Sequence, residues 1–128
     1  MENLISLRLR HPSADLSAIA KEIGLEPHRA WMKGDARQTP KAQPLEGHYD
    51  SSYVTVQIEA GTDSVNDVLQ RLCDRLAGHM NRITEIRNTG GSLEVYITLA
   101  AGHGLSIDHA TLLRLGELGL SLELDCFE

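Results

Sequence analysis

The six histidines are the first residues to examine for chemistry, because imidazole binds metals and transfers protons near neutral pH. They are His11, His28, His48, His79, His103 and His109. No two of them stand two or four residues apart, so the spacing of a zinc motif is missing. We therefore predict no metal ligands and no cofactor. The alternative is a site assembled from separate segments, for which His48, His103 and Asp108 are the candidates.

Side chains that could act as nucleophiles or as general acids lack the neighbours that such roles need. Cys73 and Cys126 lie on apolar faces, where burial raises the pKa of a thiol, so we expect both to be reduced core residues. The chain contains no G-x-S-x-G motif. Glu123 and Asp125 are expected to be solvated, because acid–base catalysis needs a desolvated cleft that separates two pKa values. The sequence predicts no catalytic residue and favours a protein that is not an enzyme.

Residues 28–41 are the one stretch whose composition departs from the rest of the chain. They surround the only tryptophan, Trp31, with four cations and one acid: Arg29, Lys33, Asp35, Arg37 and Lys41. A tryptophan beside cations on a long loop can anchor a protein partner or a small acidic ligand. The alternative is that Trp31 closes one end of the core and the loop lies over it. The predicted contact residues are Trp31, Lys33, Asp35, Arg37, His48, Tyr49 and Tyr53.

The charge of the chain argues against nucleic acid as a partner. The formal net charge is −6, and residues 51–128 carry eleven acids against five bases. Nucleic acids are bound by clustered Lys and Arg and by aromatic side chains, of which this chain has few. The N-terminus lacks a basic leader, and no apolar run approaches the ~20 residues that a transmembrane helix needs. We predict a cytoplasmic protein that binds neither nucleic acid nor membrane.

The apolar pattern predicts the elements that must position these residues. Alternation with a period of two predicts strands at 4–10, 52–59, 93–99 and 120–126, and a shorter strand around 29–32. Apolar residues on one helical face predict helices at 16–23, 65–76 and 110–118. The segment 79–88 fits either a helix or an irregular edge strand, and both interpretations stay open.

These elements predict an α+β fold in a single domain that spans residues 1–128. The expected order is β-α-β-β-α-β-α-β, with a long irregular loop at about 33–50 that holds several prolines and glycines. Clear alternation on several strands is typical of antiparallel sheets that have one buried face. We therefore expect a two-layer sandwich, with a mainly antiparallel sheet and helices on one face.

Several short motifs resemble those of a family of bacterial proteins catalogued as domain of unknown function 4279. The N-terminal carriers are Ile23-Gly24-Leu25-Glu26-Pro27, Trp31, Lys33, Gly34, Asp35, Gly47 and Ser51-Ser52-Tyr53. The C-terminal carriers are Gly104-Leu105-Ser106-Ile107 and Glu117-Leu118-Gly119-Leu120-Ser121-Leu122-Glu123-Leu124. Similar chains often have a tryptophan where this one has Tyr53. The resemblance implies the α+β fold and supplies no catalytic residues.

The sequence therefore favours a non-catalytic interaction or ligand-binding domain, with a regulatory or immunity-type role as one form of it. An acidic domain of this size could serve immunity by covering a basic active site. Self-association into a homodimer through an edge strand is a further expectation. The alternative from a different class is a small hydrolase or metal-assisted enzyme that uses dispersed histidines.

Overall fold

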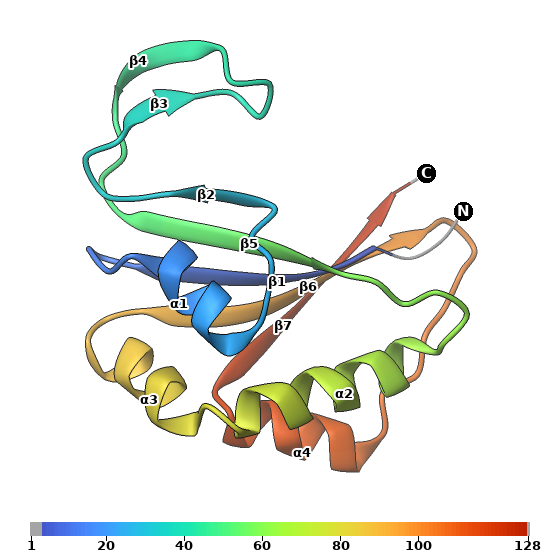
Figure 1. The fold of residues 1–128 in the computed structure, drawn as a ribbon. Helices are drawn as coiled ribbons and strands as arrows, with labels where there is room; N and C mark the ends of the chain where they lie inside the picture. Colours follow the sequence, from blue (N-terminus) through green and yellow to red (C-terminus); the bar gives the residue numbers. More distant parts are fainter. Residues whose placement is uncertain (1–3, 128) are drawn as a thin grey trace.

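The chain folds into a five-stranded sheet with a layer of helices, as shown by the computed structural model, which describes residues 4–127 (Figure 1). The strand order is β2-β5-β1-β6-β7. The strands are β1 (Leu4–His11), β2 (Arg29–Trp31), β5 (Ser52–Ile58), β6 (Ser92–Ala100) and β7 (Leu120–Phe127). Every pair is antiparallel except β6 and β7, which run parallel. The predicted α+β class with a mainly antiparallel sheet is confirmed.

Residues 4–127 form four helices, three of which begin where a polar side chain accepts a hydrogen bond from a free backbone N–H group. They are α1 (Leu16–Ile23), α2 (Val65–Ala77), α3 (Met80–Asn88) and α4 (His109–Glu117). Asp15, Ser64 and Asp108 accept from the third residue after each of them. Asp15 therefore caps α1. The segment 79–88, which was open between helix and strand, is α3.

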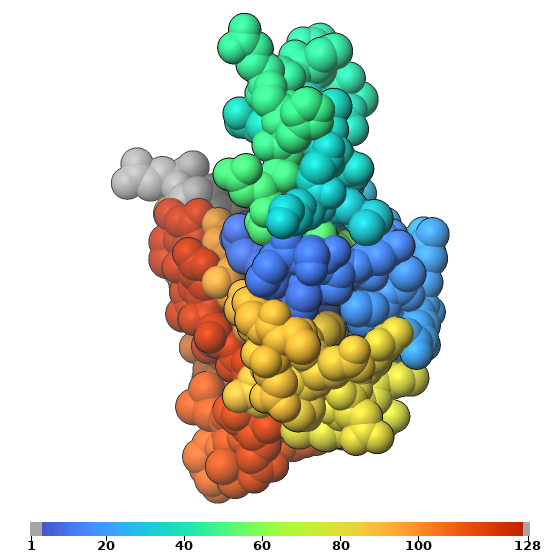
Figure 2. Space-filling view, turned by 90° about the vertical axis from the view of Figure 1, so that its left-hand side faces the viewer, coloured from blue at the N-terminus to red at the C-terminus, as the bar shows by residue number. Residues whose placement is uncertain are grey.

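The predicted irregular loop at 33–50 contains a β-hairpin, so that prediction was wrong. Its strands are β3 (Ala36–Gln38) and β4 (Pro44–His48), and they form a separate two-stranded sheet. Every residue of both strands is exposed, so no alternation of apolar residues marks them. The hairpin stands clear of the rest of the molecule in the space-filling view (Figure 2).

The core lies between the sheet and the helices. Inward residues of the strands, such as Leu7 and Ile97, form one buried cluster with residues of all four helices. Cys73 of α2 is buried, as expected. Cys126 is exposed, which corrects the prediction of a core residue, and Leu124 before it is 49% exposed. The alternation of β7 is real, but the helical layer covers only the first part of the strand.

Two contacts fix the joint between β1, α1 and the end of α3. His11 Nδ1 accepts hydrogen bonds from the backbone N–H groups of Ser13 and Ala14, so the proton of the neutral ring is assigned to Nε2, which pairs with Thr89 Oγ1 at 2.7 Å. A Cβ atom at Gly91 would lie 2.7 Å from the carbonyl oxygen of Arg10. Only glycine therefore lets the chain pass between α3 and β1.

The opposite face of the sheet carries polar and aromatic side chains. Partners across the strands share this face, because paired residues point the same way. Its rows are Trp31, Tyr53 and Arg10; then Arg29, Thr55, Arg8, Glu94 and Ser121; then Gln57, Ser6, Tyr96 and Glu123. We call it the open face.

No helix within residues 4–127 is long and apolar enough to cross a membrane.

Candidate functional site

Three aromatic rings meet at the end of the open face that lies under the hairpin. Trp31 stacks on Tyr49 with ring centroids 4.0 Å apart and planes inclined by 9°. Tyr53 lies on the neighbouring strand, 4.6 Å from Trp31. The guanidinium of Arg29 lies 5.0 Å from the Trp31 ring, and that of Arg10 lies 4.9 Å from Tyr53. We call these five residues the aromatic cluster.

Tyr49 connects this cluster to the hairpin. Its hydroxyl donates to the carbonyl oxygen of Gln38 at 3.0 Å and accepts from the Gln38 N–H at 3.3 Å. Arg29 donates to the same carbonyl oxygen at 3.1 Å. A shallow recess of about 120 Å³ lies beside these residues, between β2 and the tip of the hairpin. The cluster is therefore both the base of the hairpin and the wall of a small recess.

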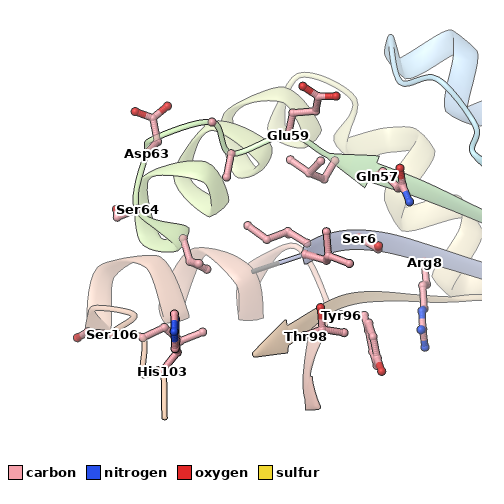
Figure 3. A pocket seen from close by; sticks show the side chains of 18 residues that line it. Ser6, Arg8, Gln57, Glu59, Asp63, Ser64, Tyr96, Thr98, His103 and Ser106 are labelled. Carbon is pink, nitrogen blue, oxygen red and sulfur yellow. The ribbon is translucent and has the colours of Figure 1, made fainter. Parts of the chain in front are cut away.

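A larger cavity of about 740 Å³ opens at the other end of the open face (Figure 3). The ends of β1, β5 and β6 form its floor, and the segments before α2 and α4 form its sides. Arg8 lies over the ring of Tyr96 with its Cζ 3.6 Å from the centroid. His103 and Ser64 come from the two side segments. The cavity therefore joins residues from the two ends of the chain, such as Leu4 and Ser106.

Carboxylates gather beside Arg8 on β6 and on the edge strand β7. Burial, and then the hydrogen bond and charge of Glu123, raise the pKa of Glu94. Glu94 Oε1 lies 3.5 Å from Arg8, and it accepts no hydrogen bond from any described residue. The hydroxyl of Tyr96 donates to Asp125 at 2.6 Å, and this bond raises the pKa of Tyr96. Arg8 is thus faced by a carboxyl group whose pKa lies above its ordinary value.

A comparison with protein families identifies the family of the chain. A family described as Domain of unknown function (DUF4279) matches residues 2–127. The chain belongs to this family. The resemblance seen in the sequence motifs is confirmed, and it covers almost the entire chain. Searches of curated proteins and of solved structures found no match.

In this DUF4279 chain the predicted contact residues divide into three groups. Trp31, Tyr49 and Tyr53 come together in the aromatic cluster. Lys33 and Asp35 lie in the turn that leads to the hairpin, where an Asp35 carboxylate oxygen accepts from the Met32 N–H at 2.8 Å.

The other two predicted residues lie on the hairpin. Arg37 is on β3, where its side chain donates to the carbonyl oxygen of Glu46 at 3.3 Å. His48 is on β4, opposite Ala36. Both side chains are exposed beyond the cluster.

The residues proposed for a dispersed metal site are not brought together. His103 lines the cavity, whereas His48 lies on the hairpin. Asp108 caps α4 and accepts from the side chain of Asn66 at 3.1 Å. Within residues 4–127, no group of three or more His, Cys, Asp and Glu side chains is placed to hold a metal ion.

Sequence reasoning missed the arginines that complete both ends of the open face. Arg10 and Arg29 join the aromatic cluster, and Arg8 joins the cavity. Arg8 and Arg10 alternate with apolar residues in β1, which placed them on the outer face. The signal for their partners is the pairing register, which a single sequence does not contain.

Proposed function

We propose that this member of the DUF4279 family is a non-catalytic binding domain that recognises an acidic segment of a protein partner at the aromatic cluster. The observation that supports it most directly is the stack of Trp31 on Tyr49 with Arg29 beside it, at the foot of an exposed hairpin. Tryptophan, tyrosine and arginine are the residues that contribute most to binding at protein interfaces.

The hairpin itself supports a role in binding. None of the residues of β3 and β4 is buried, so these strands contribute nothing to the core. An isolated two-stranded hairpin is marginally stable in water, and the aromatic stack holds this one in place. Met32 and Leu45 are 40% and 45% exposed near it. Apolar side chains that project on an arm offer contact area to a partner.

The charges on this arm favour an acidic partner. Four cations lie between β2 and the tip of the hairpin: Arg29, Lys33, Arg37 and Lys41. The one acid among them, Asp35, is engaged with the Met32 N–H. Glu46 and Asp50 follow on the returning strand and beyond it, so the excess of cations lies on the half of the arm from Arg29 to Lys41. Because the whole chain has a net charge of −6, this basic half stands out electrostatically.

The size of the recess favours a protein segment over a free small molecule. Small-molecule sites usually enclose about 300–1,000 Å³. The recess beside Trp31 and Tyr49 encloses about 120 Å³, which is room for a single side chain. A partner would place one side chain there and lay acidic residues along Arg29 and Arg37.

Site-specific photo-crosslinking tests this proposal. A photoreactive amino acid replaces Arg37 on the hairpin in one protein and Lys21 on α1 in a second. Both positions are exposed and basic, but Lys21 lies in the helical layer. In cells that naturally contain the protein, we expect an adduct with an acidic protein from position 37 only. Binding of that purified partner should then quench or shift the emission of Trp31, the only tryptophan.

The contact assignment is checked with variants that keep the core intact. Trp31→Ala and Arg29→Ala should each weaken binding of the purified partner about tenfold or more, whereas Lys21→Ala should not. Circular dichroism verifies that each variant is folded. Equal adducts at positions 37 and 21, or binding that survives both cluster substitutions, would show that the hairpin is not the binding arm.

A further inference from the structure

The cavity at the far end of the open face has the size and shape of a small-molecule site. Its volume of about 740 Å³ lies within the usual range for such sites. Figure 3 shows Arg8, Tyr96 and Ser6 along its sheet floor and His103 on another side. The Trp31 recess has no residue in common with it. It is therefore a second, separate site.

The lining divides into an apolar part and a polar part. The apolar part comes from the strand ends and the side segments: Leu4, Ile58, Ala60, Val65 and Leu105. The polar part lies on the open face, where Ser6 pairs with Gln57 on one side and with Tyr96 on the other. Thr98 Oγ1 is buried in the same floor and has no hydrogen-bond partner among residues 4–127. A ligand that fits both parts is amphipathic.

The charge of the polar part selects the ligand's head group. Among the described lining residues, Arg8 is the only arginine or lysine. The carboxylate of Asp63 is paired with Arg71 at 3.0 Å, and in Figure 3 Glu59 and Asp63 point away from Arg8. The ion pair of Arg8 with Glu94 is long, at 3.5 Å, and Glu94 Oε1 accepts no hydrogen bond from any described residue. The guanidinium lies over the Tyr96 ring, which leaves its in-plane N–H groups able to donate.

We propose that this cavity binds a small monocarboxylate with an apolar body, whose carboxylate is held by Arg8 and whose body lies along Leu4, Ile58 and Leu105. Arginine suits this role because its planar fork matches the two oxygens of a carboxylate. The neighbouring hydroxyls of Ser6 and Thr98 provide further polar contacts along the floor. The site takes a free small molecule, so it is independent of the protein partner proposed for the aromatic cluster.

Calorimetric titration of the purified chain with octanoate and with 2-naphthoate tests the proposal, with octanol as the matched neutral compound. At least one carboxylate should bind saturably, and octanol should bind at least about tenfold more weakly than octanoate, because it lacks the charged head. Arg8→Gln should remove this difference and leave octanol binding unchanged. The matched charge control is Arg29→Gln in the aromatic cluster, which should leave all affinities unchanged.

A second variant locates the site without touching the arginine. Ser6→Phe places a ring on the cavity floor, at a half-exposed position of the open face. It should weaken the binding of the carboxylates and of octanol alike. The proposal is overturned if neither carboxylate binds with a Kd below about 5 mM. It is also overturned if octanol binds as well as octanoate, or if Ser6→Phe and Arg8→Gln leave octanoate binding unchanged.

Discussion

The two ends of the open face use the same pair of groups, an arginine over an aromatic ring, in surroundings of opposite shape. At the aromatic cluster, Arg29 lies 5.0 Å from the Trp31 ring beneath a projecting hairpin. At the cavity, Arg8 lies 3.6 Å from the Tyr96 centroid within a concave wall. A projecting arm can reach into a partner, whereas a concave wall can enclose one molecule. The shape of each end, more than its residue types, therefore determines which class of ligand it can bind.

The two ends also differ in how their side chains are held. The aromatic cluster depends on contacts of Tyr49, which lies outside the five-stranded sheet. The cavity floor belongs to the central strands β1 and β6, whose inward residues are buried in the core. Local unfolding free energies are lowest where few buried contacts support a segment. The hairpin end should therefore open more readily than the cavity end.

The largest expected effect comes from a change that weakens both ends together. Gly91→Ala places a Cβ atom 2.6 Å from Ile86 Cγ2 and 2.7 Å from the Arg10 and Ile86 carbonyl oxygens. Two of these three neighbours are backbone atoms, so the chain itself must move. We expect the free energy of unfolding in urea to fall by about 2–3 kcal/mol.

The matched control is Gly116→Ala on α4, where an added Cβ atom meets nothing within 4 Å. Alanine is the better helix former, so this variant should be as stable as the original chain or slightly more stable. If Gly91→Ala had no larger effect than Gly116→Ala, the joint between α3 and β1 would be looser than the structure shows.

A smaller effect should separate the two ends. Trp31→Ala removes both ring contacts of the cluster, and each aromatic pair contributes about 0.5–1.5 kcal/mol. Amide exchange should therefore become about tenfold faster or more at Gly34 and Tyr49, whose N–H groups donate to Tyr49 and Asp35 carbonyl oxygens across the base of the hairpin. Exchange in β1 and β6 should stay unchanged. Equal acceleration in those strands would mean that the hairpin and the sheet open as one unit.

The sequence predicted those parts of the fold whose burial alternates or follows a helical face. The strands 4–10, 52–59 and 93–99 were clear because one face is buried and the other polar. The helix α3 was ambiguous because only Ile83 and Ile86 are buried in it. The hairpin was missed because it buries none of its own residues, so nothing in its pattern reports pairing.

The candidate sites, like the fold, could be predicted from the sequence only in part. Trp31, Tyr49 and Tyr53 lie together in the structure because they stand where a loop leaves the sheet and returns to it, which the sequence pattern indicates. The group of Arg8, Tyr96 and Glu94 depends on the register that places Ser6 opposite Tyr96. Composition cannot give that register. The prediction that Cys126 is buried was wrong for a related reason. Alternation shows which residues share a face of the strand, but it does not show how far the helices cover that face.

The smallest effect concerns the charge beside Arg8. Burial and Glu123 raise the pKa of Glu94 above its ordinary 4.5, so the folded chain keeps a proton that the unfolded chain has lost. The free energy of unfolding should therefore fall as pH rises from the ordinary pKa through the folded one. Glu94→Gln removes the charge and can still donate to Glu123. We expect it to stabilise the chain at pH 7 by up to about 1 kcal/mol, and the gain to vanish below about pH 4.

Urea unfolding at several pH values measures this difference, with Glu26→Gln as the control at an exposed glutamate. The sign of the change in unfolding free energy on Glu94→Gln shows whether Arg8 faces a fully paired carboxylate. A stabilising Glu94→Gln means that the wild-type carboxylate is a cost at pH 7, and Arg8 then keeps capacity for a ligand's carboxylate. A destabilising Glu94→Gln would mean that Glu94 is charged and pairs fully with Arg8. The cavity would then have no free cation. The two ends of the open face would then differ in shape alone.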